Sequence, residues 1–291
     1  MKIGILLNDL SRYKGTNLSE YQWTFGSGGE NGVVEAAEAM KKVVPEELHY
    51  LYFGNEFCEY CIPNCTQLKR WLAICQHDGL EAVFVTPVVS DGGIGRVREA
   101  MDYLMGAGFQ GAVVVNDLGV AHLLNTDYPS VPLIVGRLLD KLSHDPRGDE
   151  SAMQAYYGET GMAYATTPSV ECRYVRQALP QQMMRFEYDL PQVGFAVPEN
   201  QQSRSLYWPY HYLTTGRVCL FRSMGLNSPE KFLVGDGDCQ KTCQGLELEL
   251  QRTQNPDQTL FQKGNTIFYV SNPSNIPAML HGFDRVVFQI L

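Results

Sequence analysis

The sequence lacks the features that mark several large classes of protein. It has no run of basic residues, and its 23 Lys and Arg against 32 Asp and Glu give a formal net charge of -9. Because nucleic-acid phosphates are bound by a local surplus of Lys and Arg, we expect no nucleic-acid partner. No stretch approaches the roughly 20 apolar residues that cross a bilayer, so we expect no membrane span.

Familiar hydrolase signatures are missing as well. The histidines show neither H-x3-H nor H-E-x-x-H spacing, and the chain has no Gly-x-Ser-x-Gly motif. Proteolysis requires a nucleophile with a base, or a metal-bound water, and neither pattern is present. The first ten residues have one Lys and a short apolar run that reaches Asp9, which predicts a strand rather than a signal peptide. We therefore expect a cytoplasmic protein.

Apolar runs alternate with helical periodicity along most of the chain. The predicted strands cover residues 2–8, 49–53, 81–86, 112–116, 132–136, 169–174, 192–197 and 285–291, and the predicted helices cover 31–42, 66–77, 93–105 and 120–125. This alternation is typical of a parallel sheet, and eight strands favour a (β/α)8 TIM-like barrel, not necessarily regular, over an open doubly wound sheet. We expect a single barrel domain over residues 1–291, with residues 201–273 as a Cys-containing insertion between strands 7 and 8.

Six of the eight cysteines form two groups, namely Cys58, Cys61 and Cys65, then Cys219, Cys239 and Cys243. In a reducing compartment such cysteines are thiols or metal ligands rather than disulfides. Each group follows a predicted barrel strand, the second and the seventh. Because the loops that follow barrel strands share one face, we expect the two groups to converge there.

Three segments resemble the collagenase-like peptidase family U32. They read LYFGNEFC at 51–58, VVVNDLGV at 113–120, and GRVCLFRS followed by DCQKTC at 216–223 and 238–243. Their order and spacing are most similar to the ubiquinone-biosynthesis members of the family, UbiU and UbiV. The resemblance implies oxygen-independent hydroxylation of an aromatic or prenylated small molecule, a heterodimer with a related family member, and a 4Fe-4S cluster bound by Cys58, Cys219, Cys239 and Cys243.

Several alternatives remain open at this point. Cys61 and Cys65 are alternative ligands, and pairing Cys58-x2-Cys61 with Cys239-x3-Cys243 would complete a four-cysteine zinc site. Cysteine spacing alone does not separate zinc from iron-sulfur ligation. The cysteines are alternatively a redox pair or simply buried thiols. The corresponding functional alternatives are a peptidase, the activity in the family name, and a zinc-stabilised, non-catalytic binding subunit.

Polar residues at the ends of the later predicted strands are weaker candidates for the same face: Asn116, Asp117, Arg137, Lys141, Glu171 and Arg173. A carboxylate there could move a proton, and an Arg could bind a substrate carboxylate. Asp117 could instead cap the helix that follows it. The aromatic run at 207–212 would either stack on a planar substrate or pack in the core.

Overall fold

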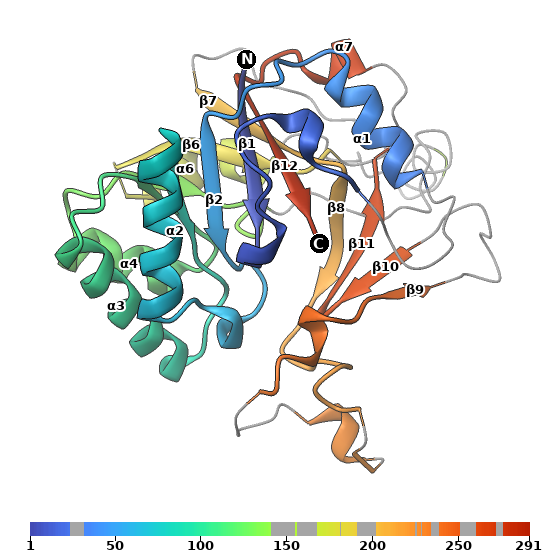
Figure 1. Cartoon of the computed structure of the whole chain (residues 1–291). Helices are drawn as coiled ribbons and strands as arrows, with labels where there is room; N and C mark the ends of the chain where they lie inside the picture. Colours follow the sequence, from blue (N-terminus) through green and yellow to red (C-terminus); the bar gives the residue numbers. More distant parts are fainter. Residues whose placement is uncertain are drawn as a thin grey trace.

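Eight parallel strands close into a barrel in the computed structural model (Figure 1). In barrel order they are β1 (Lys2–Leu7), β12 (Arg285–Ile290), β7 (Ser203–Trp208), β6 (Met183–Tyr188), β5 (Leu133–Val135), β4 (Ala112–Val115), β3 (Glu81–Val85) and β2 (Tyr50–Gly54). The structure describes residues 1–23, 32–140, 155, 168–180, 182–190, 202–224, 226–227, 229–233, 239–250, 260–271 and 276–291. The predicted (β/α)8 TIM-like barrel is confirmed, and the closed order excludes an open sheet.

The barrel strands are buried on both faces, as their apolar runs predict. The inward face carries one side-chain cluster that draws on seven strands: Leu6, Tyr50, Tyr52, Val83, Val85, Val114, Ile134, Tyr207 and Val287. The outward face packs against the helices through a larger core that includes Phe53, Phe84 and Trp208. Polar side chains therefore have room only at the two mouths of the barrel or in paired contacts inside it.

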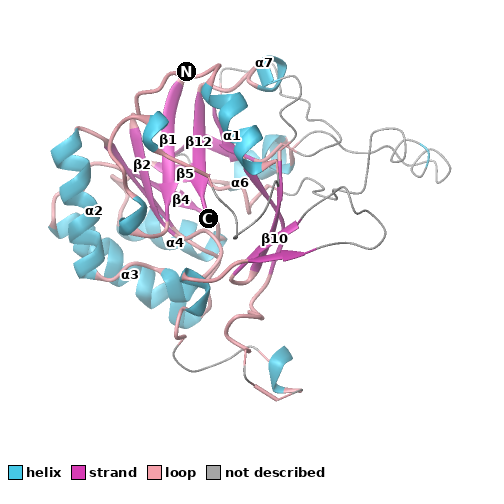
Figure 2. Cartoon of the chain, turned by 45° about the vertical axis from the view of Figure 1, so that its right-hand side comes forward, coloured by secondary structure: helices cyan, strands magenta, loops and turns pink. Residues whose placement is uncertain are grey.

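Helices cover the outside of the barrel (Figures 1 and 2). They are α1 (Val33–Lys41), α2 (Cys65–Asp78), α3 (Asp91–Gly106), α4 (Leu118–Asp127), α6 (Arg173–Ala178) and α7 (Ile276–Met279). Short 3-10 turns are η1 (Leu10–Arg12), η2 (Leu18–Glu20), η3 (Glu59–Cys61), η4 (Ser169–Glu171), η5 (Glu230–Phe232) and η6 (Thr242–Gln244). The four predicted helices correspond to α1 to α4. None of the helices among the described residues has the length and apolar character needed to cross a membrane.

Local capping explains where two of these helices begin. Asn64 and Gln67 form a capping box at the start of α2, and Gly79 ends that helix in the left-handed conformation with a φ of 68°. The Ser90 side chain accepts a hydrogen bond from the Gly93 N–H at the start of α3. Each cap lies at the end of a loop that joins a barrel strand to the next helix. The capping contact therefore also fixes the end of that loop at the carboxyl end of the barrel.

The chain between the seventh and eighth strands of the barrel forms an insertion, as predicted, and this insertion contains a second sheet that the sequence did not predict. Its antiparallel strands follow the order β8 (Tyr210–Thr215), β11 (Thr266–Val270), β10 (Leu260–Lys263) and β9 (Leu248–Leu250). This sheet projects from the barrel, and the chain after β8 extends farther still (Figures 1 and 2). The arrangement places the late cysteines outside the barrel wall, near its carboxyl end.

Two strand predictions differ from the structure. The segment 169–174 is not the sixth strand, because it forms η4 and the start of α6, and the sixth strand is β6. The predicted seventh strand, 192–197, lies outside the described residues. The seventh strand is β7, which falls within the stretch 201–273 that we had assigned to the insertion. Strand β7 was missed because it contains polar residues, although Arg204 is buried in a pair with Glu171.

Candidate metal centre

A tight loop after β2 presents two cysteines at the carboxyl end of the barrel. The side-chain oxygen of Asn55 accepts hydrogen bonds from the N–H groups of Phe57 and Cys58, at 2.9 and 2.7 Å. This Asx turn reverses the chain directly after the strand. The Cys61 N–H then donates to the Cys58 carbonyl oxygen at 3.0 Å. Both thiols are half-buried and are held within one turn of chain.

The late cysteines lie in turns beside the second sheet. The carbonyl oxygen of Cys219 accepts hydrogen bonds from the N–H and Oγ of Ser223, at 3.1 and 2.9 Å. Cys239 Sγ accepts a hydrogen bond from the Lys241 N–H at 3.4 Å. Cys243 is the central residue of η6, and all three thiols are half-buried. Backbone hydrogen bonds thus fix the turns that carry these sulfurs.

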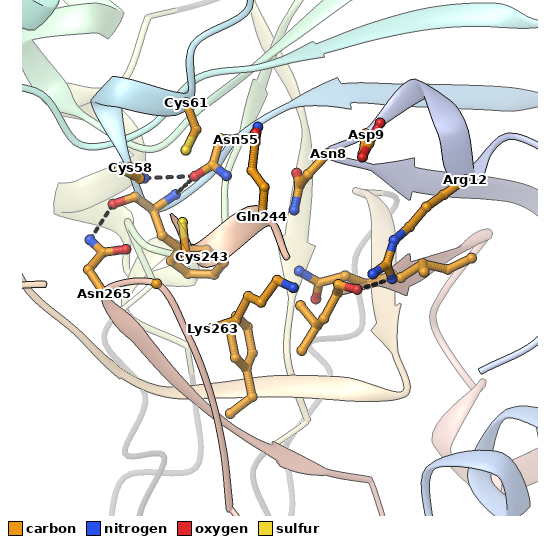
Figure 3. A pocket seen from close by; sticks show the side chains of 16 residues that line it. Asn8, Asp9, Arg12, Asn55, Cys58, Cys61, Cys243, Gln244, Lys263 and Asn265 are labelled. Atoms are coloured by element: carbon orange, nitrogen blue, oxygen red, sulfur yellow. Dashed lines mark hydrogen bonds between the residues drawn. The ribbon is translucent and has the colours of Figure 1, made fainter. Parts of the chain in front are cut away.

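The two groups meet, as the barrel topology predicts. A cavity of about 830 Å³ is lined by Cys58, Cys219, Cys239 and Cys243. A smaller cavity, drawn in Figure 3, is lined by Cys58, Cys61 and Cys243 together with amide and cationic side chains. Cys58 and Cys243 therefore belong to the wall that the two cavities share. The role of the four cysteines as ligands stays a prediction.

The two alternative ligands differ in position. Cys61 is in contact with both groups, because its hydrogen bonds with Cys58 and Cys243 lower the pKa of each of those thiols to about 7. The same contacts with Cys243 and Cys58, together with burial, raise the pKa of Cys61, so Cys61 is the thiol of the three that keeps its proton most readily. Cys65 is the first residue of α2 and lines neither cavity. Of the two, Cys61 lies beside the predicted ligands, and the role of both as alternative ligands stays a prediction.

A single zinc ion and a 4Fe-4S cluster need different arrangements of the four sulfurs. A Zn–S bond of about 2.3 Å places the four sulfurs of a tetrahedral site about 3.8 Å apart. Within the described part of the chain, no group of three His, Cys, Asp or Glu side chains is placed to hold one metal ion. In a 4Fe-4S cluster each thiolate binds a different iron, so the sulfurs surround a larger body. The four cysteines line one cavity, and the kind of centre that they hold stays a prediction.

Positive charge surrounds the larger cavity. Arg96 Nη2 lies 3.1 Å from Glu59 Oε2, and the guanidinium groups of Arg96 and Arg222 lie 5.1 and 4.8 Å from the Tyr60 ring. The chain as a whole carries a net charge of -9, so this is a local reversal of sign. The cations in the cavity wall are Arg96, Arg217, Arg222 and Lys241.

A buried ionic network lies at the barrel mouth, and the sequence indicated only one of its members. Arg137 donates to Glu56, Asp189 and Gln289, with distances of 2.7, 2.5 and 2.7 Å to the nearest oxygens. Burial opposes the charged guanidinium, but the carboxylates of Asp189 and Glu56 outweigh it and raise the pKa of Arg137. Glu56 was missed, although a carboxylate within the apolar stretch LYFGNEFC was a signal that could have found it.

The other weak candidates have structural roles. Asn116 is buried and joins two strand ends by donating to the Thr86 carbonyl oxygen at 2.9 Å. Asp117 accepts hydrogen bonds from two N–H groups at the start of α4, so the capping alternative is correct. Glu171 pairs with Arg204 at 2.9 Å. Arg173 is an exposed residue at the start of α6, and Lys141 lies outside the described residues.

The aromatic run at 207–212 belongs to the core. Tyr207, Trp208 and Tyr210 are buried, and Trp208 Nε1 donates to the Ala36 carbonyl oxygen at 2.8 Å. Tyr207 lies in the inward cluster of the barrel. The run therefore supports the two sheets at their junction instead of presenting a stacking surface for a substrate.

Comparisons with known proteins give one likeness. No protein-family model matches the sequence, and no curated protein matches it. The solved structure of the U32 peptidase Mk0906 matches with a TM-score of 0.40 and 13% identity, over 86% of this chain and 87% of that one. At this TM-score and identity, the likeness is no evidence for a shared activity.

Proposed function

We propose that Cys58, Cys219, Cys239 and Cys243 hold a 4Fe-4S cluster, and that the protein uses it to act on a small molecule. One observation carries the proposal: these four thiols come from loops more than 150 residues apart in sequence and line one cavity. An all-thiolate cluster needs four sulfurs at one place, and the loops at the carboxyl end of a barrel are where such sites are built.

The resemblance to the ubiquinone-biosynthesis proteins suggests the reaction. It implies oxygen-independent hydroxylation of an aromatic or prenylated substrate, with a related chain as partner. Such a reaction replaces a C–H hydrogen with OH, so the substrate loses two electrons. An oxygen-atom donor, or water with an external electron acceptor, must take part. The cluster would supply electron transfer or donor activation.

The chain's own residues could bind and orient such a substrate. Phe57 and Phe268 line the smaller cavity beside the shared cysteines, and they offer apolar surface to an aromatic ring. Lys263, Asn55 and Gln244 lie in the same wall and offer polar contacts to substrate oxygens (Figure 3). The smaller cavity encloses only about 60 Å³, so most of a substrate would lie in the larger cavity, which shares Phe57 and Asn265 with it.

The cluster is tested by metal analysis of protein that is purified and reconstituted without oxygen. We expect about four iron and four sulfide per chain, with a brown colour from charge transfer between sulfur and iron. Serine at position 58, 219, 239 or 243 should lower the iron content, whereas Cys65→Ser and Cys75→Ser should not. Protein that stays colourless and without iron after reconstitution contradicts the proposal. Zinc alone, with Cys239→Ser costing only stability, would favour the zinc-stabilised subunit.

A peptidase is the second candidate, because of one further contact. Ser271 Oγ contacts His211 Nε2, and His211 Nδ1 lies 3.3 Å from Asp189 Oδ1. These are the residue types of a hydrolytic triad. However, all three are buried, and no described residue hydrogen-bonds His211 Nδ1, so the link that orients the base is missing. Turnover of gelatin that survives loss of the cysteines and disappears in Ser271→Ala would favour this candidate.

A further inference from the structure

Exposed apolar side chains are frequent in the part of the chain that flanks and follows Cys219. The described residues between 218 and 233 follow β8 of the second sheet and extend away from the barrel (Figure 1). Single exposed hydrophobic residues are ordinary, but a cluster of them marks an interaction surface. We name this cluster the Cys219 face, and its exposed members are Val218, Leu220, Met224, Leu226, Phe232 and Leu233.

The local fold keeps the apolar side chains of the Cys219 face exposed. Ser223 is buried, and its Oγ donates to the carbonyl oxygens of Cys219 and Lys231, both at 2.9 Å. Phe221 is buried as well and anchors the turn. With the alternating residues 221 and 223 turned inward, their apolar neighbours remain outside. Val218 and Leu220, which flank Cys219, are therefore both exposed.

Cations accompany the apolar side chains. Arg217 and Arg222 lie within or beside the Cys219 face and also line the larger cysteine cavity. Lys231 is exposed next to Phe232, but the exposed Glu230 precedes it, so the net positive charge of the face comes from the two arginines. A two-fold contact between two copies would bring together two faces of the same net positive charge, which opposes self-association through this face. An acidic protein with an apolar centre is the complementary partner.

We propose that the Cys219 face docks a small acidic protein that carries one electron. This inference rests on the proposed function, because the carrier would exchange its electron with a cluster bound in part by Cys219. The reduced carrier loses one electron and the cluster gains it, and no bond is made or broken. Because Cys219 lies within the face, a docked carrier is brought next to a cluster ligand. Redox encounters of this kind use small interfaces that combine apolar contact with opposite charge.

The experiment uses an acidic 2Fe-2S ferredoxin as the carrier. Its affinity is measured by titration calorimetry with cluster-loaded and with cluster-free protein, and the rate of cluster reduction by reduced ferredoxin is measured by stopped flow. The test variant is Phe232→Ser with Leu233→Ser, which removes side chains that are 74% and 66% exposed and line neither cysteine cavity. The control is Tyr174→Ser on α6, where the side chain is 81% exposed.

We expect the double variant to keep its iron and to lose at least about tenfold in affinity and in reduction rate, as for two central interface residues. Lys231→Glu should weaken ferredoxin binding more at low salt than at high salt. The affinity and reduction rate of Tyr174→Ser should match those of the wild type. Equal affinity for all variants overturns the inference. So does a concentration-dependent dimer that the double variant abolishes, because the face would then serve self-association. Ferredoxin binding without any cluster would leave the docking face supported and contradict the proposed function instead.

Discussion

Arg137 and Glu56 form an ion pair at the mouth of the barrel, with Nη2 2.7 Å from Oε2 and both side chains only 1% exposed. Arg137 Nε also donates to Glu56 Oε1 at 2.9 Å, so the contact is bidentate. Glu56 precedes Cys58 by two residues, and Arg137 follows β5. The pair therefore ties the first cysteine loop to a strand three places away around the barrel.

Replacing Arg137 with Met should lower the free energy of unfolding by about 3–5 kcal/mol, because Glu56 and Asp189 would remain buried without their cation. Urea denaturation at pH 7 measures the loss. The control is Lys2→Met, since the pair between Lys2 and Glu81 is exposed and should contribute little. Equal stabilities for Arg137→Met and the wild type would show that water or rearrangement satisfies the two carboxylates.

Much of the barrel could be predicted from the sequence, and the two strands that were missed have a physical feature in common. Strands one to five and the last strand are short apolar runs, which burial on both faces requires. Strands β6 and β7 escaped prediction because they carry Arg185, Glu187 and Arg204. Arg185 pairs with Asp284, Arg204 pairs with Glu171, and one oxygen of Glu187 accepts a hydrogen bond from Tyr207. The periodicity of a sequence shows which residues are polar. It does not show which distant residue pairs with a polar side chain and allows it to be buried.

The candidate site likewise has contacts that the sequence predicted and contacts that it did not. The approach of Cys58 to Cys219, Cys239 and Cys243 could be anticipated, because loops after barrel strands share one face. The contact of Cys61 with both groups could not, because it depends on how η3 turns after Asn55. The network of Glu56 with Arg137 was also hidden, since its members lie 81 residues apart in the sequence.

Gly54 is the last residue of β2, and its replacement by Ala should destabilise the protein by roughly 2–5 kcal/mol. Its φ is 122°, and an added Cβ would lie 2.2 Å from the Val85 carbonyl oxygen. The strand pairing would have to shift directly before the cysteine loop, so we expect the iron content after reconstitution to fall as well. Thermal unfolding and iron analysis of the same sample check both effects.

The matched control for that change is Gly95→Ala. Gly95 lies in the exposed part of α3, and an added Cβ would have nothing within 4 Å. Because Ala is the better helix former, this variant should gain about 0.5–1 kcal/mol. A Gly54→Ala protein as stable as the wild type would contradict the close approach of β2 to β3.

Asp117 is expected to act as a helix cap and not as a site residue. Its Oδ1 accepts hydrogen bonds from the N–H groups of Gly119 and Val120 at 2.7 and 3.1 Å. Asp117→Ala should therefore cost about 1 kcal/mol, measured by urea denaturation, while Asp117→Ser should retain most of the stability. The iron content of both variants should equal that of the wild type. Loss of iron at unchanged stability would return Asp117 to the candidate site.

Glu187 should make the stability of the protein depend on pH. Tyr207 donates to Glu187 Oε2 at 2.6 Å, but no described residue hydrogen-bonds Oε1. Burial raises the pKa of Glu187 from 4.5 to about 7, against the opposing hydrogen bond from Tyr207. The folded protein therefore holds this proton more tightly than the unfolded chain does. As pH rises through that window the unfolded chain ionises first, and the free energy of unfolding should fall by about 3 kcal/mol.

Urea denaturation of the wild type and Glu187→Gln at pH 4.5 and pH 8 isolates this contribution, because the other titrating groups are common to both proteins. The stability of the variant relative to the wild type should rise by about 3 kcal/mol between the two pH values, since Gln has no charge to lose its hydration inside the barrel. Above pH 8 the difference should level off, because Glu187 is then ionised in both states. Parallel pH profiles for the two proteins would show that Glu187 is already ionised, with its charge balanced inside the barrel, at pH 4.5.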